Sequence, residues 1–183
     1  GAAQLLSLEL PSEELKDYTN VIIEEADRLH NLVDRLVGSR KPPDFKAVNI
    51  HEILERIKSL VEAEIKDGSI KLIRDYDPSI PSISGDSEQL IQALLNIVRN
   101  AMQALINPSV DHDLGKIVLK TRIARNISIG SDFHRLAACI EIIDNGPGIP
   151  EELVNNIFYP MISGRADGTG LGLSITHSII SQH

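Results

Sequence analysis

The stretch GTGLGLS, Gly168 to Ser174, places three glycines at alternate positions and leads into an apolar pattern that continues to the end of the chain. Glycine-rich turns before helices often bind phosphates, because N–H groups at a helix N-terminus face the anion. A Walker A motif is excluded, since Leu173 follows Gly172 where that motif needs lysine. A dinucleotide fingerprint is also excluded, because the preceding FYPMISGRAD is no strand. The plain alternative is a glycine-rich connection without a ligand.

A second glycine motif, DNGPGIP from Asp144 to Pro150, follows an apolar strand pattern. Gly146 and Gly148 permit backbone angles and close approaches that a Cβ would block. A carboxylate at the rim of an apolar pocket can accept a hydrogen bond from an exocyclic amine, which suits Asp144 for adenine. The alternative is an ordinary turn with an N-capping aspartate.

The apolar stretch ALLNIVRNAMQAL contains Asn96 and Asn100. Positions i and i+4 share one face of a helix, and carboxamide oxygens suit a hard cation such as Mg²⁺. One such oxygen, together with phosphate oxygens and waters, would complete the coordination of Mg²⁺. The alternative is a pair of surface asparagines. Arg99 is either a phosphate partner or a solvated or ion-paired side chain.

The composition excludes several functional classes. A net charge of -8 opposes binding to nucleic acid and to anionic membranes, and 3% aromatic residues are too few for a base-stacking surface. We expect a cytoplasmic protein without a membrane span, because no apolar run is long enough and GAAQLLSLEL lacks a secretion signal. The single cysteine, Cys139, is expected to be a small core residue in a reducing compartment.

Apolar periodicity divides the chain into two parts. Steps of three and four between Leu15 and Leu36 give one apolar helical face, and residues 1–37 are expected to form a partial helical hairpin. GSRKPPDFKA, residues 38–47, is a predicted linker because two prolines and Gly38 break the pattern.

The second part alternates helices and strands. The predicted helices are 49–68, with Asn49 and Glu52 as a capping box and Gly68 as C-cap, 86–106, capped by Asp86, a short helix after Pro150, and 171–182. The predicted strands are 70–76, 116–124 and 135–144, the last two separated by a polar loop at 125–134. This order predicts an α+β fold, a mixed sheet with helices on one face.

The motifs N-x₃-N, D-N-G-x-G-I-P and G-T-G-L-G-L-S, in that order, resemble the ATP-binding domain of sensor histidine kinases. These kinases belong to the GHKL group with gyrase, Hsp90 and MutL. FYPM lies where they have an aromatic-containing box beside the ATP lid. LLNIVRNAMQAL, DNGPGIP and VIIEEADRLHNLVDRL are similar to the NtrB type, the nitrogen-regulation sensor kinases.

The resemblance implies a Bergerat (GHKL) ATP-binding sandwich over 48–183. We expect it to be C-terminally truncated, because the family fold continues with two strands, and to follow the linker at 38–47 and partial dimerisation helices at 1–37. The implied cofactors are ATP and Mg²⁺, with adenine on Asp144, Mg²⁺ on Asn100 and a moving lid from Ile162 to Gly168. The implied ATP-binding residues are Asn96, Arg99, Asn100, Asp144, Gly146, Gly148, Ile149, Phe158, Arg165, Gly168, Thr169, Gly170, Leu171 and Gly172.

The resemblance also implies a reaction. Hydrolysing GHKL members have a glutamate one turn before the metal-binding asparagine, where this chain has Asn96, an amide without useful basicity. Phosphoryl transfer is therefore favoured over hydrolysis. A kinase of this type moves the γ-phosphoryl of ATP to its own histidine and then to a response regulator, here NtrC-like. It also promotes regulator dephosphorylation under a PII signal protein, and we expect a homodimer through residues 1–37.

The family's phosphoacceptor motif, H-E-[IL]-x-N-P-L, does not occur in the sequence. HEIL begins at His51 but lacks Asn-Pro, and His30 lacks the motif, so both are expected to be partly exposed helix residues. The phosphoacceptor is expected upstream of Gly1, with no catalytic residue in this chain. The alternatives are a nucleotide- or regulator-binding module without catalysis and a serine-directed GHKL kinase.

Overall fold

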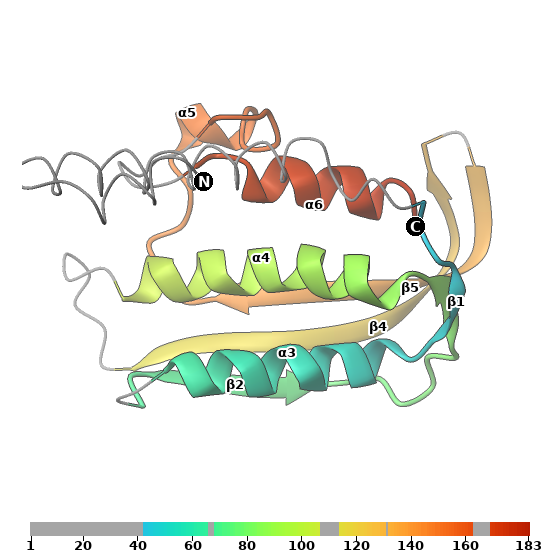
Figure 1. Ribbon diagram of the computed structural model, residues 1–183, viewed down its shortest axis with the longest axis horizontal. Helices are drawn as coiled ribbons and strands as arrows, with labels where there is room; N and C mark the ends of the chain where they lie inside the picture. Colours follow the sequence, from blue (N-terminus) through green and yellow to red (C-terminus); the bar gives the residue numbers. More distant parts are fainter. Residues whose placement is uncertain (1–41, 66–67, 107–113, 131, 163–168) are drawn as a thin grey trace, which may run out of the picture. The chain divides into compact units, whose positions relative to one another are not determined.

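The computed structural model describes residues 42–65, 68–106, 114–130, 132–162 and 169–183 (Figure 1). The chain divides into two compact units between Pro42 and Pro43, and every element below belongs to the second. The helical hairpin predicted over 1–37, with His30, lies outside the described residues. Among the described helices, none combines the length and the hydrophobicity needed to cross a bilayer.

The second unit alternates helices and strands, which confirms the predicted α+β class. Its elements are β1 (Lys46–Val48), α3 (Ile50–Glu64), β2 (Ile70–Asp75), β3 (Ile83–Gly85), α4 (Ser87–Leu105), β4 (Gly115–Ile129), β5 (Asp132–Asp144), α5 (Glu151–Val154) and α6 (Gly172–Ile180). The sheet order is β2-β4-β5, with β2 parallel and β5 antiparallel to β4, so the sheet is mixed as expected. The sequence patterns missed β1 and β3, which pair as a separate antiparallel ribbon.

Helix α3 begins at the predicted N-cap but ends early. The Asn49 side chain accepts a hydrogen bond from the His51 N–H at 3.0 Å. Glu52 accepts from the Asn49 side chain at 3.3 Å rather than from its backbone, so the link differs from a capping box. The helix ends at the extended C-cap Ile65, and the prediction of Gly68 as C-cap was wrong, although Gly68 has a φ of 68°. His51 is half-buried, as expected, with Nε2 3.0 Å from Thr121 Oγ1.

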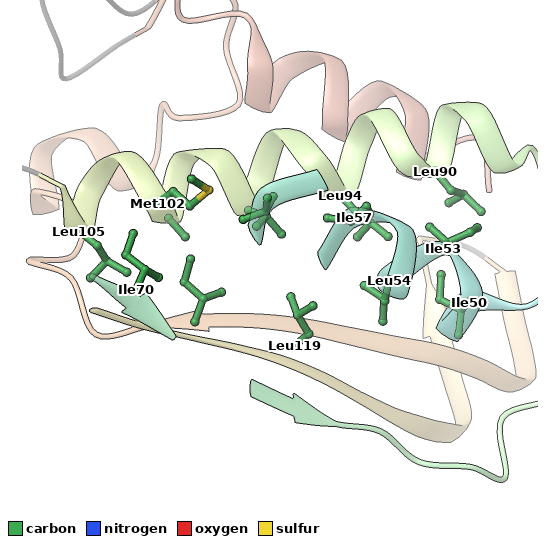
Figure 2. Close-up of a cluster of buried hydrophobic side chains, with 14 residues drawn as sticks. Ile50, Ile53, Leu54, Ile57, Ile70, Leu90, Leu94, Met102, Leu105 and Leu119 are labelled. Carbon is green, nitrogen blue, oxygen red and sulfur yellow. The ribbon is translucent and has the colours of Figure 1, made fainter. Parts of the chain in front are cut away.

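Helix α4 lies between α3 and α6 (Figure 1). Asp86 is its N-cap, as predicted, and its carboxylate accepts from the N–H groups of Glu88 at 2.9 Å and Gln89 at 3.1 Å. The buried side chains of α3 and α4 pack on one face of the sheet, against Ile117 and Leu119 of β4 (Figure 2). This packing places α4, which carries both asparagines, directly over the sheet.

Strands β4 and β5 form a longer hairpin than the sequence predicted. The proposed polar loop at 125–134 was wrong, because Ile127 pairs with His134 and Ile129 with Asp132. Gly130 supplies the positive φ of 61° at the turn. The loop prediction relied on polarity, but strand pairing needs only backbone groups, and the far end of the hairpin extends beyond the helices (Figure 1).

Cys139 is exposed, so its prediction as a core residue was wrong. In β4, Ile117, Leu119 and Thr121 face the helices, and the alternate positions face the other side of the sheet. Cys139 pairs with Arg122, whose guanidinium binds Asp75 on that open face. An apolar run therefore gave no indication of which of its members lie inside.

Candidate nucleotide-binding site

Two of the three motifs meet where α6 begins. The Asn96 side chain of α4 donates a hydrogen bond to the Gly172 carbonyl at 3.4 Å. A Cβ on Gly172 would lie 3.9 Å from Asn96 Cγ, so the glycine permits close but ordinary contact with the helix. The first helical residue of the GTGLGLS stretch thus lies against the N-x₃-N face of α4.

Thr176 adds a second attachment that the sequence reading missed. Its side chain is buried, with 4% of the residue exposed. Oγ1 lies 2.9 Å from the Gly172 carbonyl and 3.2 Å from the Ala93 carbonyl, so the hydroxyl donates to one of two acceptors. The only sequence signal for this contact was a threonine at an apolar position of the helix. Its partner on α4, Ala93, is distant in the sequence.

A backbone hydrogen bond attaches the glycine stretch to the segment that follows α5. The Met161 N–H donates to the Gly170 carbonyl at 3.0 Å. Gly170 has a φ of 64°, and a Cβ there would lie 2.5 Å from the Met161 carbonyl carbon. Only glycine fits both the conformation and the space. This contact joins Met161, the residue before the proposed lid segment, to Gly170, two residues after the segment ends.

The DNGPGIP motif forms a turn at the end of β5, beside the C-terminal half of α4. Asp144 is exposed, and its Oδ1 accepts from the Gly146 N–H at 2.8 Å. A Cβ on Gly146 would lie 3.4 Å from Ala104 Cβ and 3.7 Å from Leu105 Cδ2, so the turn approaches α4 closely. Gly148 has a φ of 79°, which requires glycine for conformational reasons.

Asn145 holds this turn in place, and the sequence reading gave it no role. Its Oδ1 accepts from the Lys116 N–H at 2.7 Å, and its Nδ2 donates to the Leu114 carbonyl at 3.3 Å. Its own N–H donates to the Lys116 carbonyl at 3.3 Å. The side chain therefore connects the end of β5 to the start of β4 and fixes the position of Asp144.

An exposed apolar rim follows the turn. Its large exposed side chains are Ile149, Val154, Phe158, Tyr159, Met161 and Ile162. The Phe158 ring packs on His177 of α6, with centroids 5.4 Å apart. Apolar surface with a few polar groups nearby is the usual lining of a site for a small molecule.

The remaining predicted residues differ in their surroundings: some are paired or buried, and two are not described. Arg99 forms an ion pair with Glu64 of α3, with Nε 3.3 Å from Oε2, which matches the ion-paired alternative. The Leu171 side chain is buried, with 1% exposed, and its carbonyl accepts from Ile175 N–H at 3.0 Å. Thr169 is half-buried, and Arg165 and Gly168 lie outside the described residues.

The described ranges contain no group of three His, Cys, Asp or Glu side chains that could hold a metal. Asn100 is half-buried, one turn beyond Asn96 on α4. A carboxamide suits Mg²⁺ as a single oxygen ligand. The residues present therefore fit an ion that arrives with nucleotide phosphates better than an ion held by protein alone.

Residues 85–183 match the family of histidine kinase-, DNA gyrase B- and HSP90-like ATPases, and the chain belongs to this family. Within it, the whole sequence is similar to kinases of the NtrB type. It is 52% identical over 183 residues to the sensory histidine kinase/phosphatase NtrB of Escherichia coli O157:H7. It is 53% identical over 183 residues to that of Salmonella typhimurium strain LT2. Each alignment covers 100% of this chain and 51% of the relative, so the chain spans about half the length of these curated relatives.

Solved histidine kinases share the fold. The nucleotide-free catalytic domain of ThkA is 27% identical, with a TM-score of 0.59 over 76% of this chain and 81% of that chain. ThkA in complex with the response regulator protein TrrA is 27% identical, with a TM-score of 0.63 over 95% of this chain and 46% of that chain. These likenesses confirm the predicted GHKL fold.

Proposed function

We propose that residues 43–183 bind MgATP as the catalytic domain of an NtrB-like sensor histidine kinase. The convergence of three motifs on α4 carries the proposal: Asn96 contacts Gly172, Gly146 approaches Ala104, and Asn100 lies between these contacts. Family membership supports nucleotide binding, and the similarity to NtrB kinases supports histidine as the acceptor.

The geometry suggests how the chain would hold ATP. Asp144 lies at an exposed turn beside an apolar rim, which suits an adenine amine and its ring. The N-terminus of α6 points its N–H groups toward any anion at the glycine stretch. Asn100 would hold Mg²⁺, which when bound neutralises phosphate charge during transfer.

In the proposed reaction, an imidazole nitrogen attacks the γ-phosphorus of ATP. The bond from phosphorus to the bridging oxygen breaks, a phosphorus–nitrogen bond forms, and ADP leaves. Asn96 lies beside the glycine stretch and donates to the Gly172 carbonyl, and its carboxamide is too weakly basic to activate water. This arrangement favours transfer to a separate nucleophile over hydrolysis.

The relatives support a response regulator as the partner. We propose that the phosphoryl group passes to an NtrC-like response regulator, and the ThkA–TrrA complex supports a regulator partner for this fold. A PII signal protein and the homodimer through residues 1–37 stay predictions from the resemblance, and a cytoplasmic location stays a prediction from the sequence.

The acceptor can be tested with ATP labelled at the γ-phosphate. The chain is incubated with a histidine-bearing helical segment of a similar NtrB kinase, and the labelled protein is treated with acid and with base. We expect a product that is labile in acid and stable in base, as a phosphohistidine is. An acid-stable product would indicate serine chemistry and contradict the proposal.

A further inference from the structure

His183 contacts three segments that are far apart in sequence. Its Nε2 accepts a hydrogen bond from the Asp86 N–H at 2.9 Å, and its Nδ1 lies 2.9 Å from the Ile179 carbonyl. Its ring packs on Phe45, with centroids 4.8 Å apart. Since Asp86 N–H is a donor, Nε2 must be unprotonated, and Nδ1 must carry the hydrogen that reaches Ile179. The contacts therefore require a neutral imidazole with the proton on Nδ1.

His183 is exposed, and Gly85 leaves room for its ring on the side that faces the protein. Gly85, the last residue of β3, is buried, and a Cβ there would lie 3.1 Å from His183 Cδ2. It would also lie 2.8 Å from Leu90 Cδ1 of α4. The absence of a side chain at Gly85 thus allows the ring to reach the N-terminus of α4.

Asp86 connects the same place to the segment that precedes β1. Its carboxylate caps α4 and also accepts from the Asp44 N–H at 2.8 Å. The next residue, Phe45, packs its ring against the His183 ring. Residues 44 and 45 follow directly on the division between the two units at Pro42 and Pro43. We name the set Asp44, Phe45, Asp86 and His183 the junction.

We propose that His183 is a positioning residue, and that the junction couples residues 44–45 to the nucleotide site. The proposal rests on the proposed function. Both helices that form the site have an end near the junction: Asp86 is the N-cap of α4, and α6 ends at Ile180, shortly before His183. Because each helix is a stiff element, a shift of α6 at the junction moves Gly172 relative to Asn96. A displacement of residues 44–45 would therefore change how the glycine stretch faces the phosphates.

Two substitutions at His183 separate the hydrogen bond from the packing. His183→Gln keeps an acceptor for the Asp86 N–H, whereas His183→Phe keeps a ring against Phe45 and loses the acceptor. Titration with ADP and Mg²⁺ should show affinity within about twofold of the parent for His183→Gln and a loss of about fivefold or more for His183→Phe. Parent-like binding by His183→Phe, or equal losses in both variants, would overturn the role of the hydrogen bond.

A second pair of variants tests the connecting segment. Phe45→Ala removes the ring that packs on His183, and Phe133→Ala removes an exposed ring in β5 as the matched control. We expect about a fivefold loss of ADP affinity in Phe45→Ala and no change in Phe133→Ala. Equal affinities in the two variants would overturn the coupling.

Two measurements do not depend on nucleotide binding, and they separate this proposal from the proposed function. Nitrogen NMR of the parent should show His183 with a protonated Nδ1 and an unprotonated Nε2; a charged ring or the other tautomer overturns the junction. Amide exchange at Ile175 in α6 should be faster in Phe45→Ala than in Phe133→Ala, and equal exchange rates overturn the coupling. Failure of the parent to bind ADP would count against the proposed function alone.

Discussion

Asn145 Oδ1 accepts a hydrogen bond from the Lys116 N–H at 2.7 Å, across the ends of two paired strands. The bond ties the chain to the start of β4 at the point where it leaves β5. Asp144 is the residue immediately before it, so the same bond determines where that carboxylate lies. The adenine contact we propose thus depends on a neighbour that does not itself need to touch nucleotide.

Asn145→Ala should weaken both the fold and the site. The substitution removes the bonds to Lys116 and Leu114 and leaves their backbone groups without this partner. We expect a fall of about 1–3 kcal/mol in the free energy of unfolding, measured in urea. ADP affinity should fall about tenfold or more at a temperature where the variant is folded. Parent-like affinity in a destabilised variant would show that Asp144 does not need this anchor.

Asp144→Asn should abolish nucleotide binding while leaving the fold intact. An asparagine oxygen can still accept from the Gly146 N–H, so the turn is retained. The carboxamide lacks the negative charge that favours an adenine amine. Asp132→Asn at the exposed start of β5 is the control, and it should bind ADP as the parent does. Equal affinities for the two variants would remove Asp144 from the site.

Gly170→Ala should destabilise the chain more than Gly148→Ala. Both glycines have positive φ, and alanine at either position costs about 1–2 kcal/mol. A Cβ on Gly148 meets nothing within 4 Å, whereas on Gly170 it would overlap the Met161 backbone at 2.5 Å. Chemical denaturation of both variants measures the difference. Equal losses would mean that the contact between Met161 and Gly170 is not tight in solution.

Arg99→Ala should leave nucleotide affinity within about twofold of the parent. The Arg99 guanidinium pairs with Glu64 on α3, and Glu64→Gln removes the same ion pair from the other side. Exposed ion pairs of this kind stabilise a protein by less than about 1 kcal/mol. A large loss of affinity in Arg99→Ala, absent from Glu64→Gln, would assign Arg99 to the phosphates instead.

Asp86 should contribute to acid sensitivity. The hydrogen bond from the Asp44 N–H, followed by those from Gln89 and Glu88, lowers the pKa of its carboxyl. A lowered pKa in the folded state means that the unfolded chain binds the proton first as the pH falls. The stabilisation is therefore complete above the unfolded pKa, about 4, and is lost as the pH falls through the folded pKa. Asp86→Asn should flatten the decline in unfolding free energy below about pH 5, and an unchanged slope would contradict this.

Local patterns predicted the parts of the fold that depend on local chemistry. Asp86 caps α4 because a side-chain oxygen reaches N–H groups two and three residues away, which sequence spacing can reveal. The family resemblance assigned Asn96 and the glycine stretch to one site, and the structure places the Asn96 side chain against Gly172.

The misses depend on contacts between distant residues. The Thr176 hydroxyl reaches Ala93, 83 residues away, and Asn145 reaches Lys116, 29 residues away. Neither partner can be inferred from spacing along a helix or strand. The exposure of Cys139 likewise depends on which sheet face the helices cover. The length of the hairpin depends on backbone pairing, which side-chain polarity does not reveal.

A calorimetric titration with ADP, with and without Mg²⁺, measures whether this chain forms a nucleotide site. We predict binding in the micromolar range that strengthens with Mg²⁺ and is lost in Asp144→Asn. Absence of binding by a demonstrably folded chain would show that the proposed nucleotide site does not form, and equal binding by parent and Asp144→Asn would show that Asp144 is not part of it.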